Sequence, residues 1–126
     1  GNPETSGKFW ADLQMFAFTR VPDPDRFMQL FVSWEVSSKA NKWQGLNQAR
    51  WTNGEYDRLF RASETELDPV KRAALFIRMN DMVVKDGVVI PLISRPRVRG
   101  ANLKLVTTLS GWDLDFSGLQ NWYREA

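Results

Sequence analysis

Residues 51–93 read WTNGEYDRLFRASETELDPVKRAALFIRMNDMVVKDGVVIPLI, and their pattern predicts two helices followed by a strand. The first helix should begin at Thr52 or Asn53, because either side chain can accept a hydrogen bond from a free backbone N–H. Glu55 follows Thr52 by three residues, which is the capping-box spacing. Residues spaced by three and four form the apolar side of this helix: Tyr56, Leu59, Phe60 and Ser63.

The second helix should begin at Asp68, which is followed by Pro69 at a position where the missing N–H costs nothing. Gly87 predicts its end. Its apolar residues span an arc too wide for a helix that lies on a surface: Val70, Ala73, Ala74, Leu75, Ile77, Met79, Met82, Val83 and Val84. Residues 88–93 lack polar alternation and predict a strand covered on both faces. We therefore expect an α/β fold with helices packed on a small mixed sheet.

The composition predicts one ordinary globular unit. Of 126 residues, 43% are apolar and 25% are charged. The net charge of +2 comes from interspersed residues, so we expect no nucleic-acid partner. Cysteine and histidine are absent, which excludes disulfides, thiol nucleophiles, histidine bases and ordinary zinc sites. We expect no cofactor, no metal and no catalysis. The polar start of the chain does not resemble a signal peptide, which predicts a cytoplasmic protein or a piece of a larger one.

The residues before Trp51 alternate between apolar and polar segments. Residues 9–18, FWADLQMFAF, predict a strand that enters the core. Residues 19–25 contain two prolines and predict a loop at the end of that strand, where ligands bind in open α/β sheets. Asp23 or Asp25 should cap a helix over residues 26–34, whose apolar residues are Phe27, Leu30, Phe31 and Trp34.

Two further segments carry candidate binding residues. Residues 35–50 form a long polar excursion with Trp43 isolated in it, and Trp43 either stacks on a ligand or anchors its own loop. Arg95, Arg97 and Arg99 alternate after the predicted strand. They would form a site for phosphate or carboxylate, or remain solvated on an edge strand.

Four ordered blocks give the chain a resemblance to a known family. They are VPDPD at 21–25, RWTNGEYDRL at 50–59, DPVKRAAL at 68–75 and VVIPL at 88–92, which leads into RPR at 95–97. With these blocks the chain resembles the C-terminal part of the extracellular solute-binding proteins of the peptide- and nickel-binding class, which serve ABC importers.

The resemblance implies a fragment of a two-lobed, periplasmic-binding-protein-like fold. Residues 1–94 would be part of the second lobe, residues 95–101 the crossing between lobes, and residues 102–126 a tail that packs on the first lobe. It further implies a periplasmic or lipid-anchored extracellular protein with a small solute or peptide as ligand and a membrane permease as partner. Without the first lobe, the tail could be exchanged between copies in a swapped homo-oligomer.

Ligand contacts are expected from five residues: Phe18, Thr19, Arg20, Val21 and Trp43. In the peptide-binding members an aspartate in the loop before the Asp-Pro element pairs with the amino terminus of the ligand, and Arg20 stands there in this chain. Arg20 would instead meet a carboxylate or phosphate, or be an ordinary surface arginine.

The sequence is also compatible with two other classes of function, an interaction fragment and a hydrolase. Exposed aromatic residues could mediate assembly in an interaction fragment that has no ligand of its own. Alternatively, Asp23 with Asp25, or Asp113 with Asp115, could be the paired carboxylates of a hydrolase. Asp-x-Asp pairs occur often in caps and turns, so the pattern favours a binding module over an enzyme.

Overall fold

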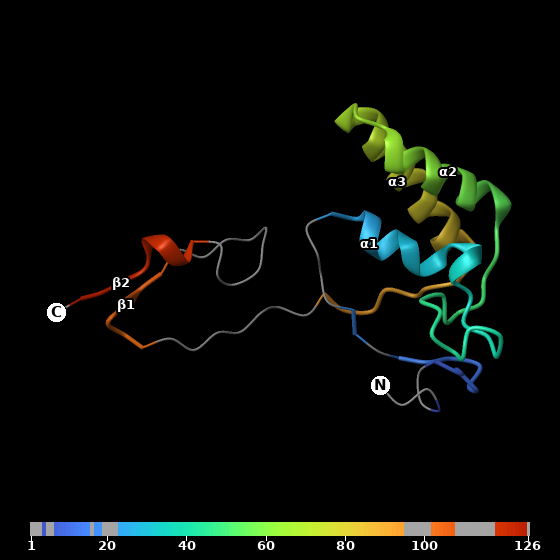
Figure 1. Cartoon of the computed structure of the whole chain (residues 1–126), viewed down its shortest axis with the longest axis horizontal. Helices are drawn as coiled ribbons and strands as arrows, with labels where there is room; N and C mark the ends of the chain where they lie inside the picture. The colour runs from blue at the N-terminus through green and yellow to red at the C-terminus, as the bar shows by residue number, and fades with distance from the viewer. Residues whose placement is uncertain are drawn as a thin grey trace. The chain divides into compact units, whose positions relative to one another are not determined.

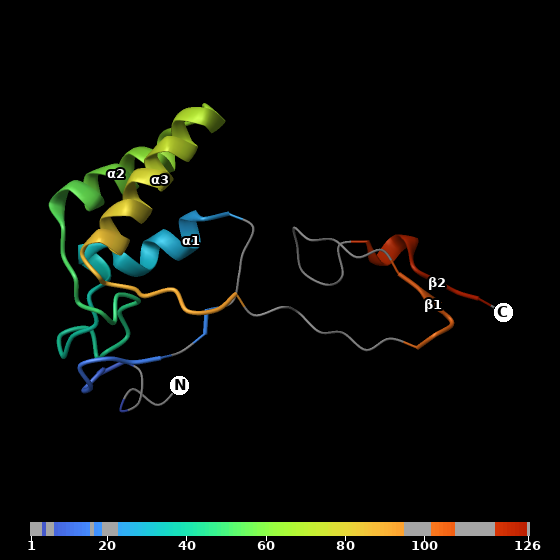
Figure 2. The ribbon, with the colours of Figure 1, turned by 180° about the vertical axis from the view of Figure 1, so that it is seen from behind.

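The computed structural model describes residues 4, 7–15, 17–18, 23–94, 102–107 and 118–125. The chain divides into two compact units, residues 1–90 and residues 91–126. The first unit contains the helices α1 (Asp25–Met28), α2 (Gly54–Thr65) and α3 (Pro69–Lys85), and the second contains the strands β1 (Leu105–Val106) and β2 (Tyr123–Arg124). In the first unit α2 and α3 lie side by side and α1 packs against both (Figure 1; Figure 2).

The two N-terminal caps predicted for α2 and α3 are confirmed. The side chain of Asn53 accepts hydrogen bonds from the backbone N–H groups of Glu55 and Tyr56, at 2.9 and 3.1 Å. Asn53 is therefore the cap, rather than Thr52. The carboxylate of Asp68 caps α3 in the same way and accepts from the second and third residues of that helix. Each cap satisfies N–H groups that have no acceptor within the helix.

Gly87 follows the end of α3, as predicted. The helix ends at Lys85, and Gly87 has a φ of +65°. A residue with a side chain is strained in this left-handed conformation, whereas glycine adopts it freely.

Among the described residues of the first unit, nine buried apolar side chains form the core. They come from the α1 region (Met28, Phe31, Val32), from α2 (Tyr56, Leu59, Phe60) and from α3 (Phe76, Met79, Val83). All four residues predicted for the apolar side of α2 are buried. The Tyr56 hydroxyl donates to the Met28 carbonyl at 2.7 Å, which fixes α2 against the end of α1.

The expectation that α3 would be covered around a wide arc is wrong in the described structure. Met79 and Val83 are buried together with Phe76, which the sequence reading had not placed on the apolar side. Val70, Ile77 and Val84 are 76, 63 and 49% exposed. Since α1 and α2 both lie on the side of Phe76, Met79 and Val83, the described residues leave the side of α3 that carries Val70, Ile77 and Val84 uncovered.

The strand predicted over residues 88–93 is not formed. The Val88 N–H donates to the Val83 carbonyl at 3.1 Å, so the chain still follows the end of α3 at this point. Val88 and Val89 pack partly against the core, but Ile90, Leu92 and Ile93 are exposed. A strand requires a neighbour for its ladder, and none pairs with this run among the described residues.

The strand predicted over residues 9–18 is also absent among the described residues of that segment. Trp10, Leu13 and Met15 are exposed, so these three side chains do not enter the core. The helix predicted over residues 26–34 is shorter than expected. The α-helix covers Asp25–Met28, a 3-10 turn covers Gln29–Phe31, and Val32 is extended before a second 3-10 turn at Ser33–Glu35. Its N-cap is Pro24, with no side-chain cap.

The second unit holds the sheet. Strands β1 and β2 pair antiparallel, with Leu105 opposite Arg124 and Val106 opposite Tyr123, and a 3-10 turn at Leu119–Asn121 precedes β2. The chain therefore combines helices with a two-stranded sheet, but this sheet is antiparallel, whereas a mixed sheet was expected. In the part of the chain that the structure describes, no helix is long and apolar enough to cross a membrane.

Candidate functional site

The five residues predicted to contact a ligand fall into two groups. Thr19, Arg20 and Val21 lie outside the described residues, as do Arg95, Arg97 and Arg99. Phe18 packs edge-on against Phe27 of α1, with 5.3 Å between the ring centroids. Trp43 lies in the loop of residues 36–50. The described part of the site is therefore built around Trp43.

Asn47 organises the loop that carries Trp43. Its side-chain amide donates to the carbonyls of Val32 and Trp51, at 3.0 and 2.8 Å, and so joins the two ends of the loop. Its backbone exchanges hydrogen bonds with Glu35 and Ser37. Asn47 is fully buried, and removal of its amide would leave two carbonyls without these partners. The loop is thus a packed structure with a defined shape.

Gly45 allows the two sides of this loop to approach closely. A Cβ atom at Gly45 would lie 2.3 Å from the Glu35 carbonyl oxygen, a distance that no folded chain tolerates. The loop therefore requires glycine here because of contact with neighbouring backbone.

Trp43 stands at the tip of the loop in a left-handed conformation. Its φ is +63°, and its N–H donates to the Ser38 carbonyl at 2.8 Å. The indole of Trp10 lies 6.3 Å from the indole of Trp43, tilted by 49°. The Lys8 ammonium lies 5.7 and 5.8 Å from these two ring centroids, and the Arg50 guanidinium lies 5.5 Å from that of Trp43. We call Lys8, Trp10, Trp43 and Arg50 the tryptophan cluster.

Arg50 fastens the N-terminal segment to the loop. Its Nε donates to the Ser37 carbonyl at 3.1 Å, and its terminal nitrogens donate to the carbonyls of Lys8 and Phe9. The Ser37 hydroxyl donates to the Gly7 carbonyl at 2.8 Å. These bonds place Trp10 beside Trp43 although 33 residues separate them in the sequence. Because its guanidinium already donates to three carbonyls, Arg50 serves to position the other three residues of the cluster.

The cluster offers an aromatic surface with a cation beside it. Trp10 is 74% exposed, whereas Trp43 is only partly exposed. The Lys8 ammonium also pairs with Glu4. Exposed indoles bind flat or apolar groups, and an ammonium nearby attracts negative charge. The sequence singled out Trp43 but not the residues around it: Trp10 lies in the run predicted as a core strand, and no local pattern marks Lys8 or Arg50.

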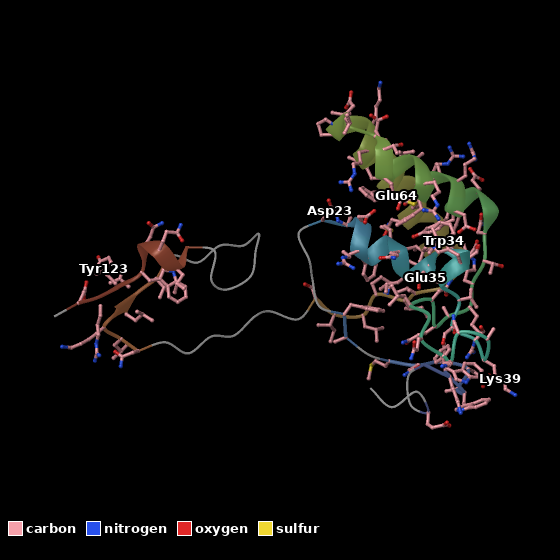
Figure 3. The ribbon with its side chains drawn as sticks, in the orientation of Figure 1. Asp23, Trp34, Glu35, Lys39, Glu64 and Tyr123 are labelled. Carbon is pink, nitrogen blue, oxygen red and sulfur yellow. The ribbon has the colours of Figure 1, made fainter. Side chains whose placement is uncertain are left out.

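Of the two aspartates considered as a catalytic pair, Asp23 has structural partners, whereas Oδ1 of Asp25 is buried without a hydrogen bond. Both oxygens of Asp23 accept hydrogen bonds from Arg72, each at 3.1 Å, and Asp23 Oδ1 also accepts the Asp25 N–H at 2.9 Å. Figure 3 shows Asp23 at the beginning of α1. The hydrogen bonds from Arg72 and Asp25 hold the pKa of Asp23 below its ordinary value. Burial, followed by repulsion from Asp23, raises the pKa of Asp25.

Arg72 links three segments of the first unit. Besides its two bonds to Asp23, its Nε donates to the Ser63 carbonyl in the last turn of α2 at 3.1 Å. Its guanidinium also lies 4.7 Å from the ring centroid of Phe76. Since both Asp23 oxygens are occupied by this arginine, the aspartate acts as an anchor for the start of α1. The other candidate pair, Asp113 and Asp115, lies outside the described residues.

A metal centre finds no support in the described residues, where no group of three or more acidic side chains could hold an ion. Comparisons of the chain with family models, curated proteins and solved structures found no match.

Proposed function

We propose that the chain is the C-terminal part of the substrate-binding component of an ABC importer of the peptide- and nickel-binding class. It would act in the periplasm, or outside the cell on a lipid anchor, and would capture a small solute or peptide without catalysis. Residues 1–94 would belong to the second lobe, with the crossing between lobes at residues 95–101 and a tail that packs on the first lobe at residues 102–126. Closure of the two lobes would hold the ligand until a membrane permease accepts it.

The observation that carries the proposal is that two of the sequence blocks behind the resemblance contact each other directly, and a third contacts the helix that follows the first. Arg72 of the block at 68–75 binds Asp23 of the block at 21–25 through two parallel hydrogen bonds. In the block at 50–59, Tyr56 donates to the Met28 carbonyl at the end of α1. These contacts place three of the four blocks in the helical part of the first unit, as one lobe of such a protein would require.

The tryptophan cluster is the proposed ligand surface. Its loop is held by Asn47 and Arg50, so little conformational freedom is lost when a ligand binds. An exposed indole at Trp10 beside a partly exposed one at Trp43 suits apolar or aromatic groups of a peptide or similar solute.

The test uses the intact protein that contains this chain. Native mass spectrometry should detect a small solute or peptide that co-purifies, and calorimetry should then measure its affinity. We expect Trp43→Ala to weaken binding by about tenfold or more, in line with the cost of removing a buried aromatic contact.

Trp34→Ala is the matched control. Trp34 is also exposed and has an arginine over its ring, Arg61 at 4.1 Å, but it packs on Phe60 of α2 (Figure 3). Its loss should leave ligand affinity unchanged. If no solute co-purifies and none of a panel of peptides binds the intact protein, the transport proposal is wrong. If a ligand binds but Trp43→Ala has no effect, the tryptophan cluster is not its site.

A second candidate function is assembly. Ile90, Leu92 and Ile93 are close in sequence and each is exposed, and exposed apolar runs often mark protein contacts. A fragment that exchanges its tail between copies would form a homo-oligomer. Solution mass distinguishes the two: a strict monomer whose tail is ordered is evidence against exchange.

A further inference from the structure

Helix α3 has a second apolar face besides the one that packs on the core. Phe76, Met79 and Val83 face the core. Val70, Ile77 and Val84 are seven apart, and on a helix of 3.6 residues per turn they lie about a third of a turn away from the core residues. These three are exposed, as are Ala73 and Ala74 beside them. We call Val70, Ala73, Ala74, Ile77 and Val84 the outer stripe.

The spacing of the outer stripe is that of a helix-helix contact. A repeat of seven residues keeps apolar side chains in line along a packed partner helix, and β-branched residues are common in such seams. The alanines are small enough to let a second helix approach closely. Near its C-terminal end the stripe borders a shallow, open depression between the side chains of Asn80, Asp81, Val84 and Lys85.

Basic residues follow one edge of the outer stripe. Lys71, Arg78 and Lys85 are also seven apart, and each directly follows a stripe residue in the sequence. Arg78 is already paired with Glu55 of α2. A second copy packed antiparallel would set Lys71 against Lys85 and Arg78 against Arg78, which is repulsive. The edge instead complements a helix with carboxylates beside its apolar residues.

A membrane surface fits the stripe less well. Helices that lie in the lipid interface bury large apolar side chains such as Trp, Phe and Leu, whereas the outer stripe consists of Val, Ala and Ile. Asp81 lies between Ile77 and Val84 on the same face, and its carboxylate would have to enter the apolar layer. In a contact between two helices, a polar residue in the seam fixes the register instead.

We propose that the outer stripe of α3 is a docking surface for an amphipathic helix of a partner protein that carries glutamate or aspartate beside its apolar stripe. Lys71, Arg78 and Lys85 would attract the carboxylates of the partner. The seven-residue spacing of the outer stripe would align its side chains with the apolar side chains of the partner helix. This surface is independent of the tryptophan cluster and of the proposed transport function.

Two synthetic peptides of three heptads test the proposal on the 126-residue chain. Both peptides have an apolar seam of leucine with a single asparagine. The residues that flank this seam are glutamate in one peptide and lysine in the other. Fluorescence anisotropy of the labelled peptides measures binding. We expect the glutamate peptide to bind at least tenfold more tightly than the lysine peptide, with a preference that weakens in high salt.

Charge reversal is the decisive variant. Lys71→Glu combined with Lys85→Glu should reverse the preference, so that the lysine peptide becomes the tighter ligand. Ile77→Asp should abolish binding of both peptides, whereas Ala62→Asp, the same charge on the exposed side of α2, should not. Because Ile77 and Ala62 are both exposed, circular dichroism should show that each variant keeps its helices.

Several outcomes would overturn the proposal: no binding of either peptide, equal affinity for both, or a preference that the charge reversal leaves unchanged. Self-association of the chain that Ile77→Asp abolishes would identify a second copy as the occupant instead. Binding to vesicles that contain anionic lipid, again lost in Ile77→Asp, would identify a membrane.

Discussion

Two parts of this molecule that follow one another in the sequence are both rich in apolar residues and differ in their structure. The pair formed by α2 and α3 is regular and supplies six of the nine core side chains. Residues 88–93 follow directly, with an even higher density of apolar side chains, and they form no regular element. The difference shows that apolar content alone does not order a segment. The segment must also satisfy its backbone hydrogen bonds.

A helix and a strand meet this requirement in different ways. Every interior N–H of α2 and α3 finds its acceptor four residues earlier, and Asn53 and Asp68 supply acceptors for the first turns. A strand finds its acceptors on a neighbour that can lie far away in the sequence. No such neighbour pairs with residues 88–93 among the described residues, and Ile90, Leu92 and Ile93 remain exposed.

The largest effect should come from the core side of α3. Met79 is fully buried, and Met79→Ala should lower the free energy of unfolding by about 3 kcal/mol, through lost burial and the cavity that remains. Ile77→Ala, on the outer stripe of the same helix, should change it by no more than about 0.5 kcal/mol. Urea unfolding followed by circular dichroism measures both. Equal losses would mean that the outer stripe is covered in solution.

Hydrogen exchange compares the two regions directly. Amides in the middle of α3, such as those of Met79 and Val83, should exchange on the order of 100-fold more slowly than those of Val89, Ile90 and Ile93, because opening them requires loss of the core. The measurement is exchange in heavy water read by NMR. Strong protection of residues 89–93 would show that they form a ladder after all and would restore the predicted strand.

The helices could be predicted from sequence because their signals are local. Asn53, Asp68 and Gly87 mark the ends of α2 and α3, and the residues that make these bonds lie within four positions of one another. The buried side of α2 was predicted in full for the same reason. For α3 the pattern predicted one wide apolar arc and did not show which part of it the core would cover, since that depends on where α1 and α2 lie.

The strands and the site depended on contacts that sequence periodicity does not report. Residues 9–18 have the composition of a strand, but a strand forms only where a partner is available. In the sequence Trp43 stands alone among polar residues, and in the structure it is partly exposed on that loop. Its neighbours Lys8 and Trp10 reach it through the hydrogen bonds of Arg50, across about 40 residues of chain. No local pattern could have indicated that contact.

The helix caps should have a smaller effect than the core. Asn53→Ala removes the acceptor for two N–H groups at the start of α2 and should cost about 1 kcal/mol of the free energy of unfolding. Thr52→Ala is the matched control: it changes the other residue that could have been the cap, and it should be almost neutral. Thermal or urea unfolding measures both. A larger loss for Thr52→Ala would show that the helix begins one residue earlier in solution.

The smallest expected effect concerns Asp23, which anchors the start of α1 to α3. Asp23→Asn removes the charge from the pair with Arg72 and should cost at most about 1 kcal/mol near neutral pH, because the Asp23 side chain is more than half exposed. The lowered pKa of Asp23 in the folded chain means that its contribution is present above the ordinary carboxyl pKa of 3.8. The contribution is lost as the pH falls through the lowered value.

Asp25→Asn should behave in the opposite way. Burial and the nearby Asp23 raise the pKa of Asp25 in the folded chain, so its charged form opposes folding above that raised value. Asp25→Asn should therefore not lower the free energy of unfolding near neutral pH. In acid, the variant and the natural chain should have the same free energy of unfolding. Urea unfolding at about pH 7 and about pH 3 measures both variants. If Asp23→Asn costs the same at the two pH values, its carboxylate does not anchor α1 through charge, and the contact with Arg72 acts as an ordinary hydrogen bond.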